Sequence, residues 1–190
     1  LGDVYKRQVL DTSGSMEGER IASLKDIMHS LIDGSASTLT GDVSLRDREN
    51  VTLQSFDSRP NAPISARFSH EDPAAAAELT EYVDGLSASG STAMYQTLLE
   101  ALRQTDPAGG IPSIVLLSDG QDTVGPRFSG FKEEYEQLPA AQRSVPVFVI
   151  LYGDASESEM RELAELTGGE VFDALGGDLA AAFKEIRGFQ

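Results

Sequence analysis

The residues Asp11-Thr12-Ser13-Gly14-Ser15-Met16 form the most informative segment of this 190-residue chain. They place one carboxylate and two serine hydroxyls on a tight turn that comes directly after the apolar pair at positions 9 and 10. Beyond this turn, apolar side chains recur at the three-and-four spacing of an amphipathic helix; they are Ile21, Leu24, Ile27, Met28, Leu31 and Ile32. The segment therefore predicts a strand, a polar turn and a helix in succession.

The same alternation continues to the end of the chain. We expect strands over 51–56, 64–68, 114–117, 145–152 and 171–172. We expect helices to begin at Asp72-Pro73, after Thr92, at Ser156 in a capping box with Glu159, and at Asp178. Strands that alternate with helices indicate a mostly parallel sheet covered on both faces. We therefore predict an α/β fold, a Rossmann-like doubly wound sheet flanked by helices, in a single domain with polar loops over 34–50 and 120–130.

Three oxygen-bearing positions are predicted to meet at one edge of this sheet. Ligands of such folds bind beyond the carboxyl ends of the strands. Asp11 follows the first strand, Asp119 follows the apolar run 114–117, and Thr92 lies in the loop 90–93. Carboxylate, hydroxyl and water oxygens are what Mg²⁺ prefers, at about six positions. The pattern thus favours a metal site, although Asp11, Ser13 and Ser15 taken alone could form an ordinary turn with helix caps.

This arrangement resembles the von Willebrand factor A domain with its metal-ion-dependent adhesion site. The resemblance rests on the pattern D-x-S-x-S, a distant Thr and a distant Asp after an apolar strand, and it extends over nearly the whole chain. It implies that the metal ligands are Asp11, Ser13, Ser15, Thr92 and Asp119. It also implies Mg²⁺ as the bound ion, with Ca²⁺ or Mn²⁺ as alternatives, and an exchangeable position that a partner's carboxylate fills.

The composition excludes several other classes of site. The formal net charge is −16 and the isoelectric point is about 4.4, which disfavours nucleic acid and anionic membranes as partners. The chain has no cysteine and two histidines, so thiolate zinc sites and histidine-rich metal centres are excluded. No apolar run approaches the roughly 18 residues of a membrane span. A metal in this chain would therefore be held by oxygen.

Residues 1–8 differ in character from the rest of the chain. The chain starts with Leu1 rather than Met, and the octapeptide resembles a translated sequencing adapter. Lys6 and Arg7 would lie in a central strand that should be apolar on both faces, and burying an unpaired cation costs several kcal/mol. We expect residues 1–8 to be non-native and the domain to span 9–190.

The function that these features favour is a metal-dependent protein-binding module, not an enzyme. Its partner would be a protein, or a neighbouring domain, that presents an acidic residue. An alternative is an intramolecular docking domain in a larger exported or chaperone-like machine. A Mg²⁺-dependent phosphoryl-transfer enzyme is less favoured, because Ser13 stands where such enzymes need a second carboxylate.

Three further hypotheses concern the surroundings of this module. The sequence from Asp11 to the final residues 184–190 resembles a bacterial subgroup in which this domain lies behind a solute-binding-like domain. That resemblance implies an extracellular, cell-surface or periplasmic parent. Asp122 could rim the site, although an exposed loop aspartate is the preferred interpretation. The last helix could shift on partner binding, in which case changing Phe183 would alter partner affinity without affecting the metal.

Overall fold

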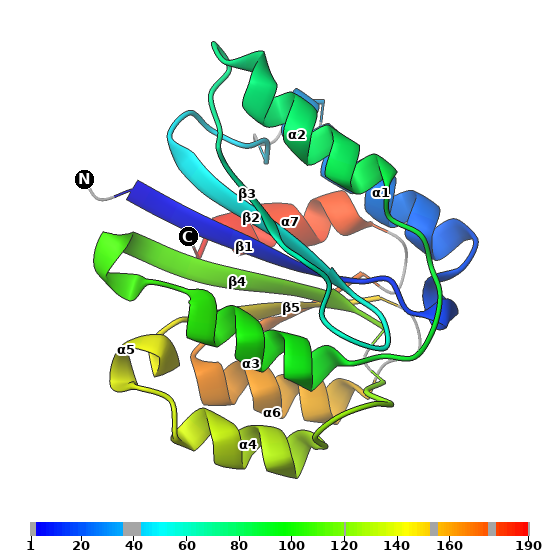
Figure 1. Ribbon diagram of the computed structural model, residues 1–190, viewed down its shortest axis with the longest axis vertical. Coiled ribbons are helices and arrows are strands. Elements are labelled where there is room, and N and C mark those ends of the chain that lie inside the picture. Colours follow the sequence, from blue (N-terminus) through cyan, green and yellow to red (C-terminus); the bar gives the residue numbers. More distant parts are fainter. Residues whose placement is uncertain (1–2, 36–42, 120, 153–155, 175–177, 190) are drawn as a thin grey trace.

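The computed structural model describes residues 3–35, 43–119, 121–152, 156–174 and 178–189, and within them the predicted sheet is confirmed. Six strands pair in the order β3-β2-β1-β4-β5-β6 (Figure 1). They are β1 (Asp3–Asp11), β2 (Glu49–Phe56), β3 (Ile64–Arg67), β4 (Gly110–Ser118), β5 (Val147–Leu151) and β6 (Val171–Asp173). Neighbours pair in parallel, except that β3 runs antiparallel to β2 at one edge. The fold is the doubly wound α/β class.

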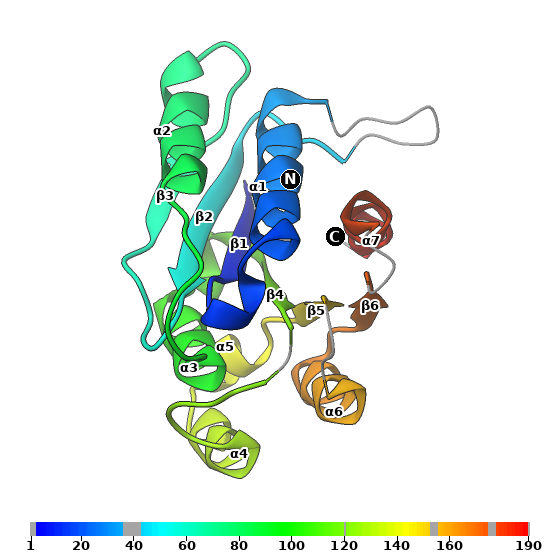
Figure 2. The same cartoon turned by 90° about the vertical axis from the view of Figure 1, so that its right-hand side faces the viewer.

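Helices cover both faces of the sheet, as Figure 2 shows in end view. One face carries α1 (Glu19–Asp33), α2 (Pro73–Asp84) and α7 (Leu179–Arg187). The other carries α3 (Met94–Gln104), α4 (Phe128–Glu136), the short α5 (Ala140–Arg143) and α6 (Glu157–Thr167). Two 3₁₀ turns, η1 (Gly14–Met16) and η2 (Pro107–Gly109), complete the described elements. Within these residues, none of the helices combines the length and the apolar character that crossing a membrane requires.

Strand β4 shows why the sheet has two hydrophobic cores. Its side chains alternate between the two faces: Ile114 and Leu116 join the α3–α4–α6 side, whereas Val115 and Leu117 join the α1–α2–α7 side. All four are at most 2% exposed. A strand buried on both faces reads as an unbroken apolar run, which is why the run 114–117 was informative in the sequence.

Residues 3–8 form the first part of β1, in the centre of the sheet. The Nζ of Lys6 lies 2.9 Å from Oε1 of Glu49 on β2, and Nη2 of Arg187 lies 3.1 Å from the same oxygen. The guanidinium of Arg7 donates to the side chains of Gln54 and Gln104. The premise that Lys6 and Arg7 would be unpaired in a buried strand is therefore wrong. That residues 1–8 are non-native stays a prediction.

Two local predictions also need correction. Ser156 precedes α6 as expected, but in the described structure its side chain makes no capping hydrogen bond. Glu159, its predicted capping partner, instead accepts a hydrogen bond from the hydroxyl of Tyr95 on α3. The polar loop expected over 120–130 ends early, because Phe128 begins α4 and packs beside Tyr95. Both differences involve Tyr95 on α3, a contact between helices that sequence spacing does not reveal.

Candidate functional site

Three loops meet at the carboxyl end of the central strands. Asp11 ends β1 and leads into η1, Asp119 follows β4 directly, and Thr92 lies just before α3. Two backbone hydrogen bonds fix the loop that carries Thr92 to the turn after β1. The N–H of Gly14 donates to the carbonyl of Gly90 at 3.0 Å, and the N–H of Ser89 donates to the carbonyl of Thr12 at 2.9 Å. Adjacent parallel strands thus bring together residues more than 100 positions apart in the sequence.

Asp11 is fully buried and organises the turn beyond it. Its Oδ1 accepts hydrogen bonds from the backbone N–H of Ser13 at 2.9 Å and from the Ser13 hydroxyl at 2.6 Å. Its Oδ2 accepts from the hydroxyl of Ser118 at 2.7 Å. Burial raises the pKa of Asp11, these hydrogen bonds oppose the shift, and the nearby charge of Asp119 adds to it. Asp11 is therefore positioned to orient Ser13, and a cation would favour its ionised form.

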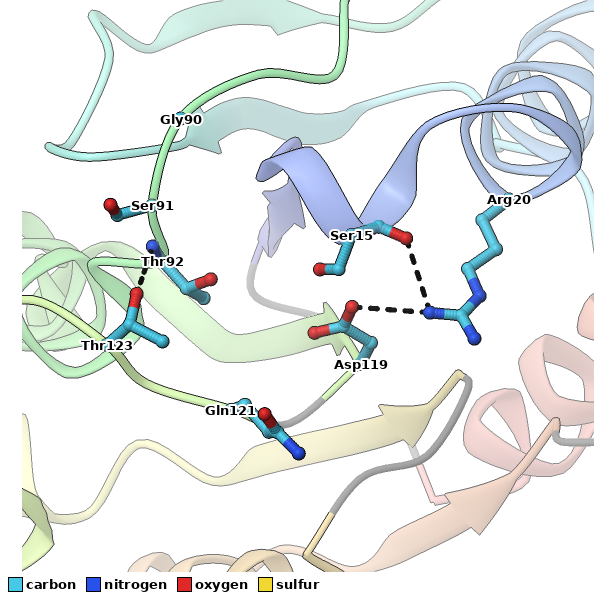
Figure 3. Close-up of a pocket in the computed structure, with 8 residues that line it drawn as sticks. All are labelled: Ser15, Arg20, Gly90, Ser91, Thr92, Asp119, Gln121 and Thr123. Carbon is cyan, nitrogen blue, oxygen red and sulfur yellow. Dashed lines mark hydrogen bonds and ion pairs between the residues drawn. The ribbon is translucent and has the colours of Figure 1, made fainter.

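A pocket of about 460 Å³ opens beside this turn. The Oγ atoms of Ser13 and Ser15 lie 3.0 Å apart. Figure 3 shows the side-chain oxygens of Ser15, Thr92 and Asp119 directed toward the same space. The lining residues are Ser15, Arg20, Gly90, Ser91, Thr92, Asp119, Gln121 and Thr123. Ser13 and Asp11 are buried behind Ser15, so hydroxyls form the wall and a carboxylate supports them.

Asp119 supplies the observation that most directly suggests a bound cation. Its side chain is 6% exposed, and its Oδ1 is buried without a hydrogen-bond partner among the described residues. The other oxygen, Oδ2, lies 3.5 Å from Nη1 of Arg20. A buried carboxylate oxygen without a donor is unfavourable, and a divalent ion bound directly or through water would remove that penalty. The donors present therefore fit Mg²⁺.

The structure brings all five predicted residues together. Hydrogen bonds link Asp11 to Ser13 and Ser13 to Ser15, and the pocket joins Ser15 to Thr92 and Asp119. That these residues ligate a metal stays a prediction. In the part of the chain that the structure describes, no group of three or more His, Asp or Glu side chains could hold an ion. An ion at this pocket would thus depend on hydroxyl oxygens.

Sequence reasoning missed the residues that position Thr92. The backbone N–H of Thr92 donates to the Thr123 hydroxyl at 2.8 Å, and its carbonyl accepts from the Thr123 N–H at 2.9 Å. Thr123 follows the predicted Asp119 by four residues, so proximity to the motif was the available signal. Arg20, at the start of α1, was also missed, although it lies only five residues beyond Ser15. Gly120, which follows Asp119 directly, lies outside the described residues.

Asp122 has a different role from the one preferred on sequence grounds. It is partly buried rather than exposed, and its Oδ1 accepts a hydrogen bond from the Tyr95 N–H at 3.2 Å at the start of α3. The helix lacks a side-chain cap from its own N-terminal residue, Ala93, so Asp122 caps it from another loop. Burial, with a contribution from the charge of Glu159, raises the pKa of Asp122 to about 6.

Solved structures with similar folds include three bacterial examples of this architecture. A von Willebrand factor type A protein from Catenulispora acidiphila superposes with a TM-score of 0.73 at 21% identity, covering 97% of this chain and 42% of that one. The von Willebrand domain of the type V pili tip protein Mfa5 from Porphyromonas gingivalis gives a TM-score of 0.68 at 14% identity, covering 99% and 95%. The pilus adhesin SpaC from Lactobacillus rhamnosus GG gives 0.66 at 17% identity, covering 100% and 30%. At these identities the likeness concerns the fold.

Sequence comparison identifies the family. Human inter-alpha-trypsin inhibitor heavy chain H4 is 29% identical over 125 residues, which cover 62% of this chain and 12% of that protein. This chain therefore corresponds to a small part of the relative. The family model for the von Willebrand factor type A domain matches residues 8–172. From the sheet, the loop arrangement and this match, we conclude that the chain belongs to the von Willebrand factor type A domain family, whose members mediate protein interactions.

Proposed function

We propose that this domain binds a partner protein through a metal ion held by Asp11, Ser13, Ser15, Thr92 and Asp119. The observation that carries the proposal is the buried, unpartnered Oδ1 of Asp119, which lies beside the hydroxyls of one pocket in the described part of the chain. Mg²⁺ is the preferred ion, with Ca²⁺ or Mn²⁺ as alternatives. When bound, the ion would supply an electrophilic position for an acidic side chain of the partner.

The chain's own residues would divide the work of holding the ion. Ser13 and Ser15 offer neutral oxygens from a turn that Asp11 fixes through two hydrogen bonds to Ser13. Thr92 is held at the pocket wall because its backbone N–H donates to the Thr123 hydroxyl and its carbonyl accepts from the Thr123 N–H. Because most of these donors are uncharged, the ion would keep much of its attraction for an incoming anion. The ion would therefore attract a carboxylate of the partner more strongly than a neutral group.

The setting of the domain is a further part of the proposal. The similar proteins include a pilus tip protein, a pilus adhesin and an inter-alpha-trypsin inhibitor heavy chain. We infer a bacterial parent that works at the cell surface, in the periplasm or outside the cell. The partner could equally be a neighbouring domain of the same polypeptide, as in a larger exported or chaperone-like machine. We favour a binding role over phosphoryl transfer, because Ser13 occupies the position where a second carboxylate would be needed.

Calorimetric titration with Mg²⁺, Mn²⁺ and Ca²⁺ tests the metal site. The variant is Asp119→Asn, which keeps the shape of the side chain but removes its charge. We expect saturable binding to the wild type and a loss of about 10- to 100-fold in Asp119→Asn. The matched control is Asp122→Asn, which makes the same chemical change in the same loop but outside the pocket; its metal affinity should stay within about twofold of wild type.

Two outcomes would refute the proposal. One is a folded wild type that binds none of the three ions at millimolar concentration, with or without added acetate. The other is equal binding by the wild type and Asp119→Asn, which would place any ion elsewhere. Circular dichroism of each variant shows whether the fold is intact, so a loss of binding can be assigned to the site.

A further inference from the structure

Two hydroxyl groups, from loops on either side of strand β1, hold the backbone at Thr92. The N–H of Thr92 donates to the Thr123 hydroxyl at 2.8 Å. The N–H of the preceding residue, Ser91, donates to Oγ of Ser58 at 2.9 Å. Thr123 lies in the loop after β4 and Ser58 in the loop between β2 and β3, and these strands flank β1 on opposite sides. Two consecutive amides are thus each bound by a side chain from a different loop.

The loop between β2 and β3 also binds the residue that follows Thr92. The N–H of Ala93 donates to the backbone carbonyl of Asp57 at 2.7 Å. Residues 57 and 58 therefore bind the chain immediately after and immediately before Thr92. The contact from Asp57 uses a backbone carbonyl, which any residue would supply, whereas the contact from Ser58 uses a side-chain hydroxyl. The identity of the residue at position 58 thus decides whether the second contact exists.

Gly90 allows Ser58 to approach the pocket wall. Gly90 has φ +70°, and a Cβ at this position would lie 2.5 Å from Oγ of Ser58. Glycine is the residue that adopts such a backbone conformation without steric cost. Gly90 and Ser91 both line the metal pocket, next to Thr92 (Figure 3). The contact between the Ser58 hydroxyl and the pocket wall therefore depends on two positions in the sequence, 58 and 90.

Ser58 itself lies outside the metal pocket. It is exposed, and it is not among the described residues that line the pocket. An effect of Ser58 on a bound ion would therefore pass through Ser91 and Thr92, which do line it. Groups that orient a metal ligand without touching the metal commonly change its affinity when they are removed. The arrangement assigns such an indirect role to the Ser58 hydroxyl.

We infer that Ser58 is a positioning residue, which holds Thr92 in place for the metal ion and thereby raises the affinity of the site. This inference rests on the proposed metal-dependent function. Without the Ser58 hydroxyl, the N–H of Ser91 would bond to water instead. The loop would then spend less time in the arrangement that presents Thr92 to the pocket, and the apparent affinity for the ion falls with that fraction.

Two measurements on a set of variants test this role. Calorimetry gives the Mg²⁺ affinity, and NMR follows hydrogen exchange of the Ser91 amide in the metal-free protein. Ser58→Ala removes the hydroxyl, and Ser58→Thr keeps it. Ser69→Ala is the matched control, because Oγ of Ser69 also accepts a backbone N–H, from Glu71 at 3.2 Å, in a loop that does not line the pocket. Thr92→Ala is measured alone and combined with Ser58→Ala.

We expect Ser58→Ala to bind Mg²⁺ about three- to tenfold more weakly than the wild type. Its Ser91 amide should exchange faster, because the hydrogen bond that protects it is gone. Ser58→Thr should restore both values, and Ser69→Ala should stay within about twofold of wild type in Mg²⁺ affinity. In the Thr92→Ala background, Ser58→Ala should cause no further loss, since no hydroxyl remains to be positioned. A general loss of structure would instead weaken Mg²⁺ binding in both backgrounds.

The results that overturn the inference differ from those that overturn the proposed function. If the wild type binds Mg²⁺ and Ser58→Ala binds it equally well, Ser58 is not a positioning residue and the metal site stands. An equal loss of affinity with and without the Thr92 side chain would also reject the inference, because the effect would not pass through Thr92. Unchanged exchange of the Ser91 amide in Ser58→Ala would reject the hydrogen bond on which it depends. If the wild type binds no Mg²⁺, the proposed function fails, and the inference fails with it.

Discussion

Replacing Glu49 with Gln should destabilise this domain far more than an ordinary surface change. The carboxylate of Glu49 is 8% exposed and holds two cations on its Oε1, Lys6 of β1 and Arg187 of α7. Its Oε2 accepts from the backbone N–H of Arg46 at 3.1 Å. Burial lowers the pKa of Lys6, and the charge of Glu49 opposes that shift. Without the carboxylate, the buried ammonium of Lys6 would lose the ion pair that offsets its burial.

The expected size of the effect depends on the burial of this cluster. Removing one partner of a buried ion pair costs about 3–5 kcal/mol, because the remaining charge is left uncompensated. For a domain of this length, 1 kcal/mol corresponds to about 2–4 °C in melting temperature. Glu49→Gln should therefore lower the melting temperature by roughly 6–20 °C. Lys6→Met should cost less, because Glu49 keeps its pairing with Arg187 and the methionine fills a similar volume.

Urea unfolding followed by circular dichroism gives the free energies of unfolding. The control is Glu162→Gln, since Glu162 pairs with Lys132 at the surface with its side chain 57% exposed, and it should change stability by less than about 1 kcal/mol. A change below about 1 kcal/mol for Glu49→Gln would refute the reasoning. It would mean that Lys6 does not lie against Glu49, and hence that residues 3–8 do not form the central strand.

Three further predictions concern other parts of the molecule. The pKa of Asp122 is raised from 3.8 to about 6, so the folded state holds this proton more tightly than the unfolded chain. The stability that Asp122 contributes should therefore fall as the pH rises from 3.8 to about 6. Urea unfolding at several pH values should show this fall in the wild type and not in Asp122→Asn. Gly90→Ala should cost about 1–2 kcal/mol in chemical unfolding, because Gly90 has φ +70° and a Cβ would lie 2.5 Å from Oγ of Ser58. Phe183→Ala should cost about 3–5 kcal/mol by the same assay, since Phe183 is 6% exposed. Its Mg²⁺ affinity in calorimetry should stay unchanged. A changed Mg²⁺ affinity would contradict the separation of α7 from the site.

Much of the fold could be predicted because β5 and the second half of β4 are short apolar runs between polar turns. The run 114–117 indicated a strand buried on both faces, and Asp72-Pro73 marked a helix start that the hydrogen bond from Ala74 N to Asp72 confirms. The motif positions could also be predicted, because Asp11 and Asp119 each come at the end of a strand. What these residues share is that short-range chemistry decides their conformation.

The failures all involve contacts between distant segments. Lys6 is tolerated in a central strand because Glu49 lies on the neighbouring strand, and no local pattern announces that pairing. Asp122 caps a helix that begins 28 positions earlier in the chain, at Met94. Glu159 bonds to Tyr95 rather than to its own helix end. In each case the polar side chain pairs with a residue that is distant in the sequence, and the spacing of residues along the chain does not reveal that partner.

Strand β1 connects the two ends of the molecule in a way that bears on mechanical load. It begins at Asp3, at the end of the sheet opposite the pocket, and ends at Asp11 beside the pocket, with β2 and β4 paired in parallel along its length. A pull between the pocket and the start of this strand would act along its axis. The covalent backbone of β1 would carry this pull directly, and the hydrogen bonds to β2 and β4 would hold the strand in register.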